Sequence, residues 1–250
     1  MNNKLTRPRL FALAAMAIAL ISLTAAIVWL ATDNRGRDII SRGPDKSVYP
    51  VTGIDISAHN GTVNFEQVAA DSIDFVMIKA TEGATFKDRA FADNYRRARK
   101  AGLKTGAYHF FRFDTPGHMQ ALNLLHSVRG RRLDMPLAID VEDWTNPDNQ
   151  PVEAVLERLR EMTDYLQLHG YPLIIYTNKN GLDRYFEGQP RDIPLWICSF
   201  SQPDNALRWH LWQHTHRGNV SGIEGLVDLN TFNGSRSEWE NWLDSLMTAQ

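Results

Sequence analysis

Two carboxylates stand two residues apart in Asp140-Val141-Glu142, at the end of an apolar run. Alternate side chains of a β-strand point to the same face, so the two Cα atoms would lie roughly 6.5–7 Å apart. Repulsion between carboxylates held this close raises the pKa of one of them. General-acid catalysis near neutral pH requires such a group, and cleavage of a glycosidic bond uses one to protonate the leaving oxygen. The pair alone fits an acid-catalysed reaction and an acidic exit from strand to loop, formed by Asp140, Glu142 and Asp143, equally well.

Acids also stand near the ends of two other apolar runs, Asp55 after Gly53-Ile54 and Asp228 after Val227. An acidic exit from strand to loop would explain one such residue. Acids at three strand ends favour a catalytic cluster, because the ends of parallel strands meet at one edge of a sheet. We expect Glu142, Asp140, Asp55 and Asp228 to form the catalytic group.

A metal site is the other use of convergent acids, because oxygen ligands bind Mg²⁺ or Ca²⁺. His210, His214 and His216 could hold a transition metal, and the last two are expected to share a strand face. Scattered histidines are more often surface or core residues, so we expect no metal. The sequence has no glycine-rich phosphate loop and no GxSxG motif, and we expect no cofactor.

Aromatic residues near the predicted strand ends are candidate sugar contacts, because a flat ring can stack on a sugar. Core packing explains any one of them equally well. The residues concerned are Tyr108, Phe110, Tyr176, Trp196 and Trp212.

The elements that must position these side chains alternate along the chain. Eight short apolar runs predict strands, and residues 88–101, 116–128 and 152–169 predict helices. This order predicts an α/β fold with a parallel sheet closed into a (β/α) TIM-like barrel, irregular because the last three strands look degenerate. The predicted strands cover residues 51–57, 74–80, 105–112, 136–142, 173–177, 195–200, 210–213 and 225–230.

The N-terminus predicts export of the rest of the chain. Residues 10–31 carry no charge and follow a basic segment, residues 1–9. A helix of this length would measure about 33 Å, enough to cross a membrane. We expect a transmembrane signal-anchor with a cytoplasmic N-terminus, and a cleaved signal peptide is the alternative. Residues 32–50 read as a linker and residues 51–250 as the catalytic domain, which we expect in the periplasm, or secreted after cleavage.

Composition limits the classes of partner. The chain has 250 residues, of which 43% are hydrophobic, and a net charge of −2. This balance is ordinary for a folded domain and gives no basic surface for nucleic acid. We expect a monomer whose partners are its substrate and the membrane.

Nine motifs along the chain together resemble the family 25 glycoside hydrolases, the lysozymes of the Chalaropsis type. They occur in the family's order over residues 51–242, although His214-Thr-His216 stands where the family more often has aromatic or small residues. The motifs are Gly53-Ile-Asp55-Ile-Ser57, Asn60-Gly61, Phe75-Val-Met-Ile-Lys79-Ala-Thr-Glu82-Gly83, Gly106-Ala-Tyr108-His109-Phe110, Leu137-Ala-Ile-Asp140-Val-Glu142, Ile175-Tyr176-Thr177, Leu195-Trp196-Ile197, Trp212-Gln213 and Gly222-Ile-Glu-Gly-Leu-Val-Asp228-Leu-Asn230.

The resemblance implies an N-acetylmuramidase that hydrolyses the β-1,4 bond between N-acetylmuramic acid and N-acetylglucosamine in peptidoglycan. It implies Glu142 as the general acid and Asp140 as a neighbour that tunes the site and orients the substrate's acetamido group. Asp55 and Asp228 would complete the acidic floor. Glu82 joins Tyr108, Tyr176 and Trp196 as an implied substrate-positioning residue, and Trp212 belongs to the expected substrate contacts.

Two other functions compete with this interpretation. A catalytically silent peptidoglycan-binding envelope protein would be expected to have lost at least one of the four acids. A chitinase-type barrel would carry a DxxDxDxE run, whereas Leu137, Ala138 and Ile139 before Asp140 are apolar. The mechanism stays open between a retaining route and attack by the substrate's own acetamido oxygen.

Overall fold

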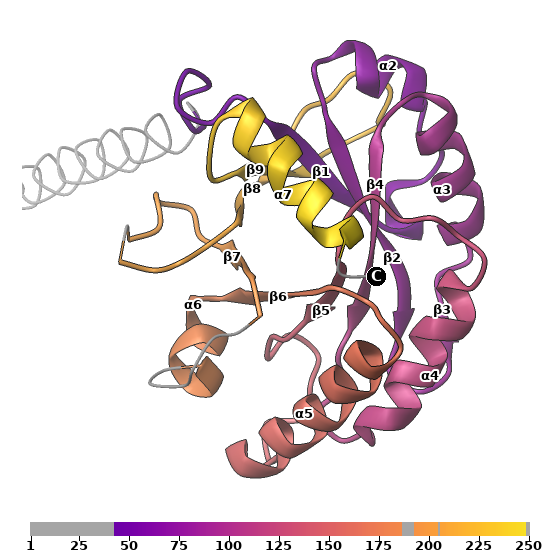
Figure 1. Ribbon diagram of the computed structural model, residues 1–250, viewed down its shortest axis with the longest axis vertical. Helices are drawn as coiled ribbons and strands as arrows, with labels where there is room; N and C mark the ends of the chain where they lie inside the picture. Colours follow the sequence, from indigo (N-terminus) through magenta and orange to yellow (C-terminus); the bar gives the residue numbers. More distant parts are fainter. Residues whose placement is uncertain (1–42, 187–192, 205, 249–250) are drawn as a thin grey trace, which may run out of the picture. The chain divides into compact units, whose positions relative to one another are not determined.

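Eight strands close into a barrel in the computed structural model, which describes residues 43–186, 193–204 and 206–248 (Figure 1). Around the barrel the order is β1-β2-β4-β5-β6-β7-β8-β9, with β9 back on β1, while β3 pairs only with β2. The predicted α/β barrel is confirmed, and each predicted strand is present. The strands are β1 (Thr52–Ile56), β2 (Phe75–Glu82), β3 (Phe86–Lys87), β4 (Lys104–Phe110), β5 (Leu137–Asp140), β6 (Leu173–Asn178), β7 (Leu195–Cys198), β8 (Leu211–Gly218) and β9 (Val227–Phe232).

The direction of β9 departs from the predicted parallel sheet. Strands β1, β2 and β4–β8 pair in parallel, but β9 runs antiparallel to both β8 and β1. Residues 219–226 are too few for a crossover, which takes about a dozen residues or more. The chain therefore turns back directly after β8, and β9 begins at the end of the barrel where the parallel strands finish.

Helices cover part of the outside of the barrel (Figure 1). The predicted helices are confirmed as α3 (Phe91–Lys100), α4 (Gly117–Val128) and α5 (Val152–Leu168); α2 (Phe65–Ala70) was not predicted. Buried aliphatic and aromatic side chains fill the layer between these helices and the strands. Short helices follow β6, namely α6 (Lys179–Gly181) and η2 (Leu182–Phe186).

Aromatic side chains cover the outer face of β7 and β8. Tyr49, at the end of the predicted linker, packs there with Trp209 and Trp212. The ring centroids of Trp209 and Trp212 are 5.9 Å apart. These rings bury the apolar faces of Leu195 and Ile197.

The inside of the barrel is packed and one end is closed by α7 (Arg236–Thr248), a helix that the sequence analysis did not predict. Trp239 of α7 stacks on Phe75 at the start of β2, with 5.1 Å between ring centroids, and meets Phe232 at the end of β9. A Cβ atom at Gly53 or Gly106 would collide with Phe75 or Met77. These two glycines therefore make room for the side chains that fill the barrel.

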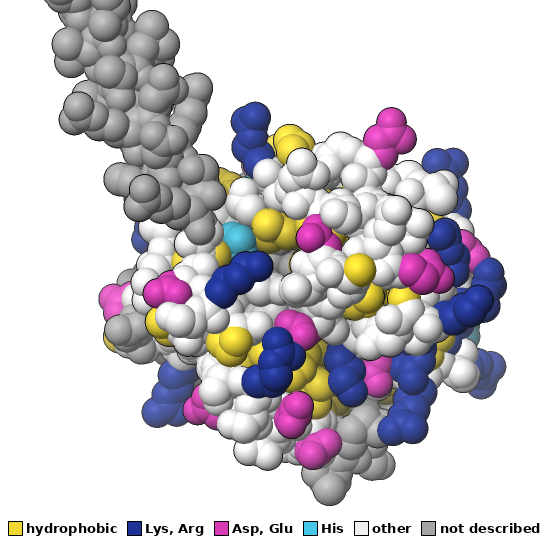
Figure 2. Space-filling model, turned by 90° about the horizontal axis from the view of Figure 1, so that it is seen from above, with side chains coloured by type: hydrophobic (Ala, Val, Ile, Leu, Met, Phe, Trp, Pro, Cys, Tyr) yellow, Lys and Arg dark blue, Asp and Glu magenta, His cyan; other side chains and the backbone are white. Residues whose placement is uncertain are grey.

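The predicted transmembrane segment, residues 10–31, lies outside the described residues, as do residues 1–9 and most of the predicted linker. Within the part of the chain that the structure describes, no helix has both the length and the apolar character needed to span a membrane. On the face shown in Figure 2, Lys and Arg side chains lie among Asp and Glu side chains.

Candidate active site

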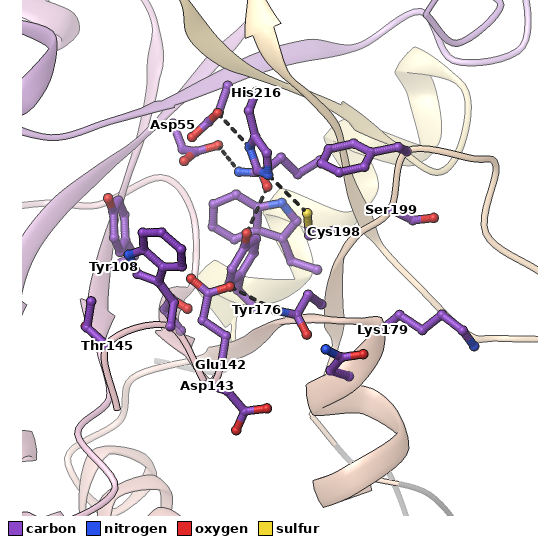
Figure 3. Close-up of a pocket in the computed structure, with 18 residues that line it drawn as sticks. Asp55, Tyr108, Glu142, Asp143, Thr145, Tyr176, Lys179, Cys198, Ser199 and His216 are labelled. Atoms are coloured by element: carbon purple, nitrogen blue, oxygen red, sulfur yellow. Dashed lines mark hydrogen bonds and ion pairs between the residues drawn. The ribbon is translucent and has the colours of Figure 1, made fainter. Parts of the chain in front are cut away.

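A groove of about 1040 Å³ opens at the carboxyl ends of the parallel strands (Figure 3). The four predicted catalytic acids all line it, although they come from β1, from β5 and the residues after it, and from β9. Its walls consist of Asp55, Tyr108, Asp140, Glu142, Asp143, Trp144, Thr145, Tyr176, Asn178, Lys179, Asn180, Trp196, Cys198, Ser199, Phe200, Gln213, His216 and Asp228.

Asp140 and Glu142 face the groove together, as the alternation along the strand predicts. β5 ends at Asp140, but the Val141 amide still donates a 2.8 Å hydrogen bond to the Tyr176 carbonyl on β6. The extended path therefore continues to Glu142. Ile139 and Val141 point the other way, into the core beneath the helices.

Glu142 is half-buried, and hydrogen bonds fix both its side chain and its backbone carbonyl. Its side chain accepts a hydrogen bond from Asn178 Nδ2 at 3.1 Å, and its carbonyl accepts one from the buried Asn146 at 2.9 Å. Burial raises the pKa of the Glu142 carboxyl, while the Asn178 hydrogen bond and the charge of His216 oppose the rise. A carboxyl with a raised pKa and access to the groove is suited to donate a proton.

Asp140 lies deeper than Glu142 and is 7% exposed. Burial and the nearby Glu142 raise its pKa well above the usual range. Its Oδ1 atom has no hydrogen-bond partner among the described residues. A buried polar atom without a partner is costly, so this oxygen is available to a polar group of a bound ligand.

Asp55 sits at the centre of a hydrogen-bond network in the barrel. Its Oδ2 atom accepts from Gln213 at 2.9 Å and from Asn230 at 2.8 Å. The far ends of the two amides accept from Tyr176 Oη and Trp196 Nε1, each at 2.8 Å. Burial, and then the charge of Asp228, raise the pKa of Asp55 to about 8.

Asp228 reaches the groove because β9 is reversed. We predicted it at the finishing end of a parallel strand, but it is the second residue of an antiparallel one. The starting end of a reversed strand lies at the same edge as the finishing ends of its neighbours. Asp228 is therefore the direct register partner of Asp55 on β1, and its Oδ1 lies 2.8 Å from His216 Nδ1.

Comparisons with known proteins agree with this geometry. The model of the family "Glycosyl hydrolases family 25" matches residues 54–223, which is more than half of the chain. The chain belongs to glycoside hydrolase family 25. The family that the sequence motifs predicted is thereby confirmed.

Two relatives and a solved structure of family 25 illustrate the similarity. The autolytic lysozyme of Clostridium acetobutylicum is 35% identical over 182 residues, which cover 72% of this chain and 55% of that protein. Lysozyme M1 of Streptomyces globisporus is 31% identical over a match that covers 78% of this chain and 74% of that protein. The family 25 glycosyl hydrolase of Bacillus anthracis superimposes with a TM-score of 0.71 at 34% identity, over 77% of this chain and 93% of that one. The chain thus spans little more than half of the first relative.

Two residues predicted to contact substrate lie elsewhere in this family 25 barrel. Trp212 points out of the barrel, between Tyr49 and Trp209, because strand alternation turns its neighbour Gln213 inward. Glu82 is not among the residues that line the groove and pairs with Lys79 at 2.8 Å and with Arg112 at 3.8 Å. Tyr108, Tyr176 and Trp196 do line the groove.

Sequence reasoning did not identify several groove residues, among them Gln213, Asn178, Cys198 and Trp144. Gln213 could have been found, because the inward face of β8 alternates with Trp212. From the sequence, the role open to His216 is that of a metal ligand on the same face as His214. The structure separates the two: His214 packs edge-on against Trp212, whereas His216 lines the groove.

Proposed function

We propose that this protein is a muramidase that hydrolyses the β-1,4 bond between N-acetylmuramic acid and N-acetylglucosamine in peptidoglycan. The observation that carries the proposal is the groove of the family 25 barrel, in which Glu142 stands half-buried among four further carboxyls. Relatives named lysozyme support it, as does the N,O-diacetylmuramidase of Arthroderma benhamiae, which is 28% identical.

Glu142 is suited to the role of general acid. Its raised pKa keeps a proton available, and its position on the groove wall lets that proton pass to the oxygen of the leaving sugar. Asn178 fixes the carboxyl with a 3.1 Å hydrogen bond. After the bond breaks, the Glu142 carboxylate can take the proton of the attacking water.

Asp140 is suited to orient the substrate. The acetamido N–H of an N-acetylated sugar is a donor for its unpartnered Oδ1 atom. That hydrogen bond would favour the ionised carboxylate and turn the acetamido oxygen toward the anomeric carbon. The oxygen then bonds to this carbon as the glycosidic bond breaks, and water later releases the product with its configuration retained.

The test is digestion of purified peptidoglycan sacculi by the full-length chain, followed by mass spectrometry of the released fragments. We expect fragments that end in reducing N-acetylmuramic acid. Replacing Glu142 by Gln is expected to lower turnover by about 10²–10⁴-fold, because the proton donor is lost while the shape of the side chain is kept. Glu157→Gln, an exposed change on α5, is the matched control and keeps full activity.

Other outcomes assign other functions. Fragments that end in reducing N-acetylglucosamine would identify a hydrolase of the other glycosidic bond. A folded wild-type chain that binds sacculi and releases nothing would instead be the silent peptidoglycan-binding protein.

The site of action that we propose is the outer side of the cytoplasmic membrane, with residues 10–31 as a single membrane-spanning anchor. The uncharged run and the basic residues before it support this orientation. The chain should stay with membranes after alkaline carbonate extraction, and protease should reach the barrel only from the periplasmic side. Release of the chain in a shortened form would identify a cleaved signal peptide.

We further propose that the protein acts as a monomer, because one chain supplies all four predicted catalytic acids of the groove. Light scattering of the detergent-solubilised chain should give the mass of one copy. A stable dimer would contradict this.

A further inference from the structure

His216 reaches the groove because β8 is irregular. The register of β8 against β9 runs from Gln213 opposite Asn230 to Thr215 opposite Leu229, so β8 has one extra residue at this point. In a regular strand, residues 213 and 216 would face opposite sides. The β-bulge turns both toward the barrel mouth, as bulges near active sites often do.

The imidazole of His216 is held on three sides. Its Nδ1 lies 2.8 Å from Asp228 Oδ1, and its Nε2 lies 3.7 Å from Cys198 Sγ. The ring of Phe200 packs edge-on against it, with 5.0 Å between centroids. Figure 3 shows His216 near Asp55, with Cys198 beside the ring. Both nitrogens therefore have a hydrogen-bond partner, and the Asp228 carboxylate favours a protonated Nδ1.

Most of the titratable groups around His216 are acids. The acids that line the groove with His216 include Asp228 on β9, Asp55 on β1 and Glu142 after β5. The thiol of Cys198 on β7 lies beside the ring, and Lys179 of α6 contributes a positive charge at the rim of the groove. The hydrogen bond to Asp228 raises the pKa of His216 to about 10. The ring is therefore positively charged throughout the neutral range, and its charge lowers the pKa of Glu142.

We propose that His216 is a positioning residue, whose imidazolium fixes the Asp228 carboxylate beside Asp55 and sets the pH range in which Glu142 acts as the acid. The proposal rests on the muramidase function proposed above. His216 contacts Asp228 and acts through its charge on Glu142, which lines the same groove. The ring does not itself change protonation during turnover.

The test compares kcat/KM against pH for three variants at one ionic strength. His216→Gln removes the charge, so both limbs of the profile should move to higher pH, by roughly 0.5–1 unit because the ring is partly exposed. The basic limb moves because Glu142 keeps its proton longer. The acidic limb moves because the carboxyls of the groove lose a neighbouring positive charge. His216→Lys keeps a cation and should return both limbs toward their wild-type positions.

His214→Gln is the matched control, because His214 is the neighbouring histidine whose pKa burial lowers to about 4, which leaves it uncharged. It should leave both limbs in place. The proposal is overturned if His216→Gln lowers the rate equally at every pH, or if Lys fails to restore the limbs. Failure of the muramidase function would look different, because the wild-type chain would then release no fragments at all.

Discussion

The chemistry of the groove depends at the residue scale on how deeply each carboxyl is buried. Asp55 and Asp140 lie at the bottom, where burial favours the neutral acid. Glu142 stands nearer the opening and keeps a hydrogen bond from Asn178. Carboxyls of one chemical type thus take different roles because their surroundings differ.

Asp55→Asn should change how stability depends on pH. The pKa of Asp55 is about 8 in the folded chain, against about 3.9 for an exposed Asp. Between these pH values Asp55 holds a proton in the folded chain and has released it in the unfolded chain. The free energy of unfolding therefore falls as the pH rises from about 4 to about 8. The Asn variant has no such proton, and its Tm should exceed that of wild type at pH 8 by a few degrees while its activity falls.

Thermal unfolding of both proteins between pH 5 and 8 measures this effect. Asp148→Asn, a change at an exposed loop residue, should follow the wild-type curve. Parallel curves for Asp55→Asn and wild type would show that Asp55 is ionised in the folded chain.

The loop after β5 is the element that gives the groove its rim. Thr145 has φ of 58°, a strained conformation for a β-branched residue. The buried Asn146 fixes the turn through bonds to the Phe111 carbonyl and the Phe113 amide, both 2.9 Å long. Trp144, the neighbour of Thr145, is 73% exposed on the groove wall. A fixed turn that exposes an indole is suited to stack on a sugar ring.

Trp144→Ala should therefore weaken substrate binding. We expect KM for soluble glycan fragments to rise about tenfold, which corresponds to about 1.4 kcal/mol, with little change in kcat. Steady-state kinetics would measure both constants. Leu168→Ala removes a side chain that is 83% exposed on α5 and serves as the control. A fall in kcat with constant KM would place the indole in catalysis instead of binding.

The groove and the helix that closes the barrel lie at opposite ends of the barrel. The acids gather at one end, and α7 closes the other by packing Trp239 and Leu243 onto the interior side chains. The packed interior lies between them. Substitutions at the closed end should therefore affect activity only by lowering the stability of the fold.

Trp239→Ala tests this separation. The side chain is 3% exposed and packs on Phe75 and Phe232, so its removal should lower the free energy of unfolding by about 3–5 kcal/mol. Urea unfolding measures the loss, and kcat of the folded fraction should stay near wild type. If Trp239→Ala lowered the free energy of unfolding no more than the exposed change Trp144→Ala does, α7 would not be part of the cooperative fold.

The sequence by itself determined the barrel and the face that Asp140 and Glu142 share, because strand alternation is a property of the local backbone. The predicted strand ends brought Asp55 and Asp228 into the predicted site, and the motifs indicated the family. Only the tertiary structure decided that β9 runs backward, that a bulge turns His216 inward, that Trp212 packs outside, and that α7 closes the barrel. These features depend on the partner that each strand or helix meets, and residues distant in the sequence supply that partner.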